Sequence, residues 1–566
     1  MTVEAARLRT NVLVVGSGAA GMNAALAAAE AGARVILADR SLIGRGGATI
    51  MAQMTVAVAL GESGPDGWEH HLADTLAAGR GLCDADMARI VCEGGPEEIR
   101  RLDGWKVGWA RDPDGTIRSA HAPGHDRARC VYVDFLSTGP AVSKTMRGRV
   151  QREPAITRIG DLCVVDLVLR DGAAAGAVGV SVSDGRPVAI AAGAVVLATG
   201  GITRLYGRNS ASANMGGDGH ALALRAGAEL TDMEFVQFFP IGHLAPRLVG
   251  MDPIMWDPFR YKLGGRLLNR EGREFMGDYG SPEDGHYNAT RDLATQAILS
   301  EVKAGRGSPA GGAFLSFRHV PAERLREAFG PVIDRLAQNG IDLLERDVEV
   351  APIAHYHMGG VRVDRRLETR VSNLFAAGEI VAGANGANRL SGNAITEALV
   401  FGRRAGAAAA GRAREIGPLP TPTDATAMRL ADATGAGSGF EGARMVARLQ
   451  DLMATHVGPL RTDQGLRDAL DGIAALTASL GDAPPGRPGP FDMARLDWFD
   501  LRNMLPVAEA VVRSALARQE SRGAHQRDDY PAMAEDWAFH HTIALENGAM
   551  MLGRVGVVPA EPAAAA

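Results

Sequence analysis

The sequence predicts an α/β fold, and three apolar runs that each end in a glycine-rich turn are the observations that predict it. The runs and their turns occupy residues 11–21, 195–201 and 374–379. A short apolar run followed by glycine is typical of a buried parallel strand that turns sharply into a loop or helix. Because the carboxyl ends of parallel strands share one edge of a sheet, where ligands bind, we expect the three turns to converge on one ligand.

The first turn carries the most specific pattern. Gly16-x-Gly18-x-x-Gly21 directly follows the apolar run 11–15. In a dinucleotide site one glycine makes the turn, one lets the backbone approach the pyrophosphate, and one lets the following helix pack on the sheet. The N-terminus of that helix also attracts phosphate groups.

The residues after this turn fit the same unit. Small residues predict a helix over 22–31, Gly32 is its expected C-cap, and a second strand is expected over 34–38. Asp39 ends that strand, at the place where an acid bonds a ribose hydroxyl. An ordinary turn without a ligand is the alternative to a dinucleotide site.

The second and third turns indicate which dinucleotide is bound. An NAD enzyme could share the first motif, but the strands ending at Gly200 and Gly378, the latter followed by Glu379, favour FAD.

Composition and charge exclude several classes of protein. The chain has 566 residues, of which 46% are hydrophobic and 71 are glycine, and its net charge is −6. This length and composition predict an enzyme of three or four domains with a large core, and no basic cluster indicates nucleic acid or an anionic membrane.

Targeting and metal signals are absent from the sequence. Residues 1–10 carry no signal pattern, and no apolar stretch is long enough to cross a membrane, so we expect a soluble, cytoplasmic protein. The cysteines Cys83, Cys92, Cys130 and Cys163 form no Cys-x-x-Cys pair. We therefore expect no disulfide framework, iron–sulfur cluster or metal site within the chain.

Further motifs follow along the chain in one order. They are Gly217-Asp218-Gly219-His220, Leu230-Thr231-Asp232-Met233-Glu234-Phe235, Gly264-Gly265-Arg266, Thr290-Arg291-Asp292, His355-Tyr356-His357-Met358-Gly359-Gly360, Asn388-Arg389-Leu390-Ser391-Gly392-Asn393-Ala394 and Glu520-Ser521-Arg522-Gly523-Ala524-His525. With them the chain resembles the flavoprotein subunits of succinate dehydrogenase and fumarate reductase, a family that includes L-aspartate oxidase. The resemblance covers nearly the whole chain, from about residue 11 to about residue 541.

The resemblance implies a domain plan. A Rossmann-like FAD-binding domain would comprise 1–237 and 352–415, with an inserted α+β capping domain at 238–351. A linker at 416–439, a C-terminal helical domain at 440–545 and a tail at 546–566 would follow. Apolar residues at helical spacing support helices in the C-terminal domain, among them one over 507–519 just after Pro506.

The resemblance also implies the chemistry. Members of the family move a hydride between flavin N5 and a C–H bond beside a carboxylate. Arg291 matches the arginine that acts as acid and base, Arg389 matches the arginine that pairs with the substrate carboxylate, and His355 matches the histidine that donates to it. His357 shares a strand face with His355, so it is either a second ligand-facing histidine or a buried hydrogen-bonded one.

The expected cofactor contacts come from the glycine-rich turns and the matched motifs together. They are Gly16, Gly18, Ala19, Ala20, Gly21, Asp39, Arg40, Ser41, Gly46, Gly47, Ala48, Ala198, Thr199, Gly200, Asp218, Gly378, Glu379, Arg389, Gly392, Asn393 and Ala394.

Three positions depart from the family. Ala48 stands where some members carry the histidine that binds flavin covalently, so we expect non-covalent FAD. Phe239 and Ile241 replace a histidine and a threonine that hold the second carboxylate of a dicarboxylate. Neither side chain donates a hydrogen bond, which predicts an apolar far end of the substrate at Phe239, with His243 as a partial substitute at most.

The third departure concerns proton delivery. Leu263 occupies the place of a glutamate that leads to the catalytic arginine. Another route, through Tyr261, His286 or Asp292, or a different mode of delivery is then required.

Several functions stay open at this stage. The leading interpretation is an FAD-dependent dehydrogenase or reductase that acts on a C–C bond next to a carboxylate or carbonyl, but not on plain succinate or fumarate. The alternatives are an amine oxidase like L-aspartate oxidase, an electron-transfer subunit without a substrate of its own, and an inert FAD-binding scaffold. The motif at 520–525 suggests a ferredoxin-like iron–sulfur partner, and dioxygen is the alternative electron acceptor.

Overall fold

The computed structural model describes residues 5–134, 136–248, 254–256, 260, 263–280, 291–330, 332–417, 425–435 and 440–558. The chain forms two compact units. The first, unit 1, comprises Met1–Gly207, Ala211–Phe235 and Tyr356–Ala566, and the second, unit 2, comprises Arg208–Ser210 and Val236–His355. Unit 2 therefore covers the segment expected to form the capping domain.

A seven-stranded sheet is the centre of unit 1, with the order β6-β2-β1-β9-β8-β7 and with β16 paired to β9. Its strands are β1 (Ala6–Val15), β2 (Val35–Ala38), β6 (Ile156–Ile159), β7 (Leu162–Arg170), β8 (Ala173–Ser181), β9 (Pro187–Leu197) and β16 (Leu374–Ala376). β1, β2, β6, β9 and β16 run parallel, and β7 and β8 are antiparallel additions. Every residue of β9 is buried, as expected for a central strand covered on both faces.

The strand ends confirm the predicted convergence of the three turns. Val15 pairs with Ala38 on one side and with Leu197 on the other, and Leu197 pairs with Ala376. The carboxyl ends of four strands therefore lie level at one edge of the sheet, and the glycine-rich turns leave from that edge.

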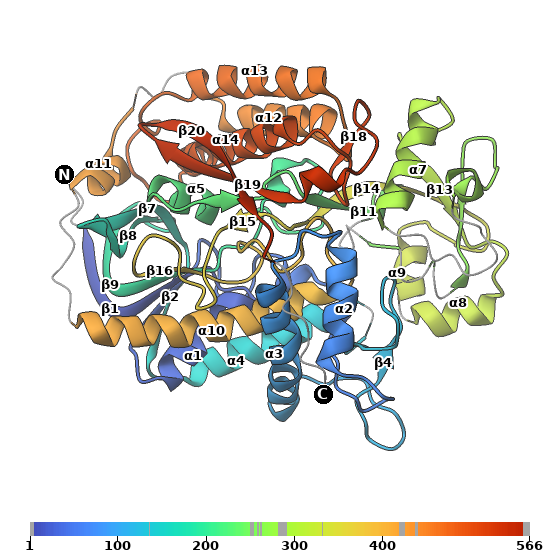
Figure 1. Cartoon of the computed structure of the whole chain (residues 1–566), viewed down its shortest axis with the longest axis horizontal. Coiled ribbons are helices and arrows are strands. Elements are labelled where there is room, and N and C mark those ends of the chain that lie inside the picture. Colours follow the sequence, from blue (N-terminus) through green and yellow to red (C-terminus); the bar gives the residue numbers. More distant parts are fainter. Residues whose placement is uncertain are drawn as a thin grey trace. The chain divides into compact units, whose positions relative to one another are not determined.

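Two helices of unit 1 approach each other closely at two glycines. They are α1 (Ala19–Glu30) and α10 (Asn393–Ile416), which run near each other in Figure 1. A Cβ atom added to Gly406 would lie 2.1 Å from the carbonyl oxygen of Ala24, and one added to Gly402 would lie 2.4 Å from that of Ala20. Only glycine therefore fits on α10 at these two positions.

The other elements of the N-terminal part are short or peripheral. They are η1 (Thr49–Met51), β3 (Val56–Ala57), α2 (Trp68–Ala78), α3 (Ala85–Gly104), β4 (Ser119–Ala120), β5 (Cys130–Val131), α4 (Thr138–Arg152), η2 (Thr203–Leu205), α5 (Asp218–Arg225) and β10 (Leu230–Thr231).

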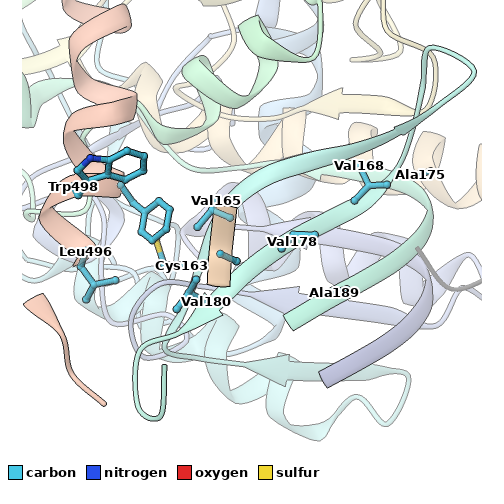
Figure 2. Close-up of a cluster of buried hydrophobic side chains, with 11 residues drawn as sticks. Cys163, Val165, Val168, Ala175, Val178, Val180, Ala189, Leu496 and Trp498 are labelled. Carbon is cyan, nitrogen blue, oxygen red and sulfur yellow. The ribbon is translucent and has the colours of Figure 1, made fainter. Parts of the chain in front are cut away.

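The described residues of the C-terminal part of unit 1 include the helices α11 (Ala425–Asp432), α12 (Gly442–His456), α13 (Asp463–Leu480) and α14 (Met493–Ala517). The prediction of a helix starting after Pro506 was wrong, because α14 begins at Met493 and includes that proline. Leu496, Trp498 and Phe499 pack against buried side chains of β7 and β8 (Figure 2). Burial of these large side chains offsets the roughly 3 kcal/mol that an internal proline costs a helix.

The predicted linker and tail are also partly wrong. Helix α11 lies within 416–439, and Met428 and Leu430 of α11 pack against the cluster in Figure 2. Residues 418–424 and 436–439 of the predicted linker lie outside the described residues. The predicted tail contains β20 (Ala549–Gly556), and its last residues, 559–566, lie outside the described part.

β20 forms a hairpin with β19 (Phe539–Glu546) through Asn547 and Gly548, whose φ angles are +50° and +81°. Asn-Gly is the preferred pair for a two-residue hairpin turn, because both positions need positive φ. The hairpin belongs to the sheet β15-β10-β19-β20, with β15 at Gly360–Val361. The segment 440–545 is thus not entirely helical, since it also contains β17 (Leu460–Arg461), β18 (Gln526–Arg527) and η4 (Glu535–Trp537).

Unit 2 has an α+β composition. Its sheet has the order β11-β14-β13-β12, formed by β11 (Val236–Ala245), β14 (Val348–His357), β13 (Ala313–Ser316) and β12 (Arg266–Leu268). Its helices are η3 (Met276–Tyr279), α7 (Arg291–Lys303), α8 (Ala322–Phe329) and α9 (Val332–Gln338). Its aromatic core includes Trp256, whose ring centroid lies 6.0 Å from that of Phe317 and 5.9 Å from that of Phe329.

Neither a membrane span nor a metal centre is found in the described parts of the chain. No helix there is long and apolar enough to cross a membrane. No group of three or more histidine, cysteine, aspartate or glutamate side chains among the same residues is placed to hold a metal ion.

Candidate active site

The turn after β1 is closed by two contacts that exclude side chains. A Cβ atom on Gly16, whose φ is +100°, would lie 2.3 Å from the carbonyl oxygen of Ala198. A Cβ atom on Gly21 would lie 1.8 Å from the carbonyl oxygen of Gly16. The first turn therefore touches the second, and the backbone is exposed to a ligand at the edge of the sheet.

Helix α1 begins at this turn without a side-chain cap. Its N-cap is Gly18, which makes no capping hydrogen bond, and the backbone N–H of Ala19 donates to Thr49 Oγ1 at 3.0 Å. An uncapped helix N-terminus behind a glycine turn suits the phosphates of a dinucleotide.

Asp39 lies at the end of β2, as expected, and is held by two serines. One carboxylate oxygen accepts from the backbone N–H and the hydroxyl of Ser17, at 2.8 and 2.6 Å. The other accepts from the N–H and hydroxyl of Ser41, both at 2.8 Å. These bonds fix the carboxylate beside the first turn, and its contact with a ribose stays a prediction.

Arg40 and Asp218, two further predicted cofactor residues, pair with each other. Arg40 Nη1 lies 3.1 Å from Asp218 Oδ2, and Arg40 Nη2 donates to Asp500 Oδ2 at 3.0 Å. Asn503 Nδ2 donates to the other oxygen of Asp218 at 2.9 Å. This polar network ties the end of β2 to α14, which sequence reasoning did not anticipate because Asp500 and Asn503 lie far along the chain.

Gly201 and Glu379 bring the second and third turns together. A Cβ atom on Gly201 would lie 2.2 Å from Glu379 Oε1, and one on Gly378 would lie 2.7 Å from the Cβ of Ala20. Thr199 Oγ1 is buried and has no hydrogen-bond partner among the described residues. A buried hydroxyl of this kind is normally paired, so a polar ligand at this edge would satisfy it.

Gly46, Gly47 and Ala48 form the loop that leads into η1. The N–H of Gly47, at φ +80°, donates to Ser212 Oγ at 2.7 Å. Ala48 is the N-cap of η1 and carries no nucleophilic atom. The positive φ of Gly47 favours glycine at that position, and a Cβ atom on Gly46 would meet the side-chain end of Asn214 at 2.5 Å.

The start of α10 is anchored within the protein. Asn393 Oδ1 lies 2.8 Å from His71 Nε2, and Asn393 Nδ2 donates to Thr75 Oγ1 at 3.1 Å. Gly392 has φ +85°, and a Cβ atom there would lie 2.7 Å from the backbone nitrogen of Ala57. The side chain of Asn393 therefore holds α10 against α2, and any contact of Gly392, Asn393 or Ala394 with FAD would come from the backbone.

Arg389 is buried, with 4% of its surface exposed. Its guanidinium carbon lies 4.4 Å from the centre of the Tyr356 ring, and Tyr356 Oη lies 2.6 Å from Glu397 Oε2. Asn385 Nδ2 donates to the same carboxylate oxygen at 2.6 Å. Sequence reasoning missed Tyr356, Asn385 and Glu397, although a tyrosine between two candidate histidines was a usable signal.

Two buried carboxyl groups lie in this region. Burial raises the pKa of Glu379 to about 8 and that of Glu397 to about 7. The positive charge of Arg389 opposes both shifts. The edge of the sheet can therefore hold protons near neutral pH.

His357 is buried and hydrogen-bonded, which supports the second of the two arrangements considered. Its Nε2 lies 3.2 Å from the carbonyl oxygen of Met233, and its ring centroid lies 5.6 Å from that of His220. Burial lowers the pKa of His357 to about 4, so the imidazole is neutral. Its backbone N–H donates to Glu379 Oε1 at 3.2 Å.

Within unit 2, Phe239 contacts both of the predicted catalytic residues. The Arg291 guanidinium carbon lies 5.0 Å from the centre of the Phe239 ring, and the His355 ring centroid lies 5.3 Å from it. Arg291 Nη1 also donates to Gln237 Oε1 at 3.3 Å, and His355 Nδ1 lies 2.7 Å from Ser210 Oγ. The structure thus brings Arg291, His355 and Phe239 together within unit 2.

His243 does not replace the lost polar residues. Its Nδ1 accepts from Trp256 Nε1 at 3.1 Å, and its Nε2 lies 2.5 Å from the carbonyl oxygen of Pro246. Both ring nitrogens are therefore committed to the protein, which corrects the idea of His243 as a partial substitute. Of the alternative proton carriers, Tyr261 and His286 lie outside the described residues, and Asp292 lies in the first turn of α7.

The motif at 520–525 forms an internal ion network. Arg518 Nε donates to Glu234 Oε1 at 2.6 Å and Arg518 Nη1 to Glu520 Oε1 at 3.0 Å, and all three side chains are fully buried. Arg522 Nε donates to Glu520 Oε1 at 2.7 Å. These buried ion pairs stabilise unit 1, and the iron–sulfur partner that the motif suggests stays a prediction.

A parallel sheet with three glycine turns at one edge, an uncapped helix and an unsatisfied buried hydroxyl defines a dinucleotide-binding α/β flavoprotein. Comparison with known proteins agrees. Residues 11–395 match the family model described as FAD binding domain, and residues 446–560 match that described as fumarate reductase flavoprotein C-term.

Similar proteins are known from several organisms. The chain is 35% identical to one of the subunits of fumarate reductase (CoM/CoB) from Methanothermobacter marburgensis, over 94% of this chain and 97% of that protein. It is 34% identical to L-aspartate oxidase of Streptomyces coelicolor, over 95% of this chain and 92% of that protein. Among solved structures, E. coli quinol fumarate reductase FrdA has a TM-score of 0.90 and 31% identity, and 99% of each chain is covered.

The chain therefore belongs to the succinate dehydrogenase and fumarate reductase flavoprotein family. It is an oxidoreductase with FAD as its cofactor. The residues at the strand edge of unit 1 fit this cofactor.

Proposed function

We propose that the protein is an FAD-dependent dehydrogenase or reductase acting on a C–C bond next to a carboxylate or carbonyl, and that plain succinate and fumarate are not its substrates. The observation that carries the proposal is the apolar character of β11 at two positions. Phe239 and Ile241 are fully buried, and both nitrogens of His243 are already bonded. The second carboxylate of a short diacid would find no donor on these three side chains.

FAD, when bound, accepts or gives a hydride at N5. The cofactor would lie along the turns of Gly16, Thr199 and Gly378, without a covalent bond, because Ala48 cannot form one. Asp39 would orient the ribose from its place at the end of β2.

The protein's own residues would bind the acid and move the proton. A planar guanidinium suits a carboxylate, and Arg389 is held face-on against Tyr356 for that task. His355, whose Nδ1 faces Ser210, would donate to a substrate carboxylate through Nε2, as its match to the family implies. Arg291 would hold and transfer the proton at the neighbouring carbon, as its match to the family implies.

The proposal is tested by reducing the flavin anaerobically with a panel of monocarboxylates, cyclic keto-acids, succinate and aspartate, and following the loss of absorbance. Rapid bleaching by a monocarboxylate or keto-acid, but not by succinate, is the expected result. Turnover of succinate, fumarate or aspartate at ordinary enzymatic rates contradicts it. Arg389→Met is expected to abolish bleaching by every acid of the panel.

Two other functions have specific support. The relative from Streptomyces coelicolor is an L-aspartate oxidase, so an amine oxidase that produces peroxide is the second candidate. Several relatives are named as subunits, so we also propose an iron–sulfur partner as electron acceptor. Peroxide formation in air would favour the oxidase, and co-purification of an iron–sulfur protein would favour the partner.

A further inference from the structure

Unit 2 contains a partly buried cation whose charge is not balanced. Arg208 is partly buried, and its Nη2 donates to the carbonyl oxygen of His243 at 3.2 Å. Among the described residues no carboxylate forms an ion pair with Arg208. Burial lowers its pKa, and no acid opposes that shift.

Two fully buried arginines elsewhere in the chain are paired with acids. Arg129 lies within 3.1 Å of carboxylate oxygens of Asp66 and Asp74. Arg518 is neutralised by Glu234 and Glu520. Other buried arginines, Arg461 and Arg495, bond backbone carbonyl oxygens instead of acids. Among the described residues the side chain of Arg208 has one such carbonyl partner, so its remaining N–H donors are available to an anionic ligand.

The position of Arg208 links it to the proposed reaction site. Its carbonyl oxygen accepts from the N–H of Ala354 at 3.1 Å, and the N–H of Ser210 donates to the carbonyl oxygen of Ala354 at 3.0 Å. Residues two apart on an extended segment share a face, and Ser210 Oγ lies 2.7 Å from His355 Nδ1. Arg208 therefore leaves the backbone on the face that carries His355.

The guanidinium of Arg208 contacts β11 at a later strand residue than Arg291 and His355 do. Arg291 and His355 contact Phe239, whereas Arg208 reaches the carbonyl of His243. These two strand positions are separated by roughly 13 Å, at about 3.3 Å per residue. Ile241 lies between them, on the same face of the strand as Phe239.

We propose that Arg208 binds a carboxylate at the end of the substrate remote from the reacting carbons, with an apolar segment of the substrate along Phe239 and Ile241. This inference rests on the proposed function and narrows it. The apolar residues of β11 exclude a second substrate carboxylate close to the reacting bond. Arg208 would bind such a carboxylate farther from that bond. The substrate class is therefore a long-chain diacid, in contrast to a four-carbon one.

Straight-chain diacids and monoacids of about six to twelve carbons, matched in length, are the probes for this site. Their affinities would be measured by isothermal titration calorimetry of the FAD-loaded protein without oxygen. The wild type is expected to bind the best-fitting diacid about tenfold or more tightly than the matched monoacid, because a charge-assisted bond is added.

Arg208→Met is expected to bring the two affinities within about twofold, and Arg208→Lys to keep part of the difference. Arg335→Met, which removes an exposed arginine of α9 in the same unit, is the matched control and should change neither affinity. If Arg208→Met does not fold, Arg208→Gln and Arg208→Lys carry the comparison.

Equal binding of diacid and monoacid by the wild type would overturn the role of Arg208, as would a diacid affinity unchanged in Arg208→Met. Failure of the proposed function has a different signature. In that case succinate bleaches the flavin, or no acid of either series binds, whatever residue stands at position 208.

Discussion

Tyr356 donates a 2.6 Å hydrogen bond to Glu397, and the face of the same tyrosine ring carries the guanidinium of Arg389. The carboxylate thus fixes the ring, and the ring fixes the arginine that we propose to bind the substrate. Asn385 donates to the same oxygen of Glu397, so the carboxylate cannot turn away without losing two bonds. Tyr356 and Glu397 are in this sense positioning residues for Arg389.

Glu397 should make the stability of the protein depend on pH. Burial raises its pKa to about 7, so the folded chain holds this proton to a higher pH than the unfolded chain does. The contribution of this carboxyl group to the folding stability is complete below its pKa in the unfolded chain. It is lost as pH rises through the higher pKa that the group has in the folded chain. Glu397→Gln removes this loss, so relative to wild type its stability should improve between pH 5 and pH 8, by roughly 3 kcal/mol at about 1.4 kcal/mol per pKa unit.

Thermal unfolding of wild type and variant at both pH values measures this effect. Glu415→Gln, which changes an exposed glutamate of the same helix, should follow the wild type across the range. A Glu397→Gln curve parallel to wild type would show that the carboxyl group does not titrate in this window.

Asp500 is expected to be essential for the stability of unit 1. It accepts from Arg40 at 3.0 Å and from Arg204, and its side chain is almost fully buried. Asp500→Asn leaves two arginines without this charge, which should cost about 3 kcal/mol or more. Glu509→Gln breaks the exposed pair with Arg513 on the same helix and should cost less than about 1 kcal/mol. Urea unfolding of the two variants compares them, and equal effects would contradict a structural role for the buried pair.

The close packing of the first turn predicts a specific loss of FAD. Alanine at Gly21 would place its Cβ 1.8 Å from the carbonyl oxygen of Gly16, so the turn must open. Gly21→Ala should lower the FAD affinity at least about tenfold, measured by flavin fluorescence on titration of the apoprotein. Gly104→Ala, at the end of α3 where a Cβ meets no atom within 4 Å, is the control. Retention of full FAD affinity by Gly21→Ala would mean that the turn can relax.

The features that the sequence predicted well are local ones. The turns at Gly16, Gly200 and Gly378 each combine an apolar strand with a glycine that the backbone requires, and a parallel sheet brings such strand ends together. The Asn547-Gly548 turn was an equally local signal, and treating the C-terminus as a tail ignored it.

Features that depend on distant partners were not predictable in this way. Asp500 neutralises Arg40 across 460 residues of sequence, and Glu397 reaches Tyr356 across 41. Nothing in the spacing of these residues indicates the contacts. The start of α14 is a mixed case, because packing of Trp498 on β7 and β8 depends on distant residues whereas its N-cap, Asp492, was a local signal that the prediction missed. The unbalanced charge of Arg208 likewise emerges only when its neighbours are known.

The loop before η1 predicts how the flavin is held. Ala48 is the N-cap of that short helix, and its methyl side chain cannot form a bond to the flavin ring. Denaturation with acid should therefore release all of the flavin into the supernatant, where its absorbance equals that of the folded protein. Flavin fluorescence on the protein band of an acid-washed gel would contradict this and would require a covalent link elsewhere. Ala48→His tests the converse, because a nucleophilic ring at this loop position is expected to convert part of the flavin to a protein-bound form.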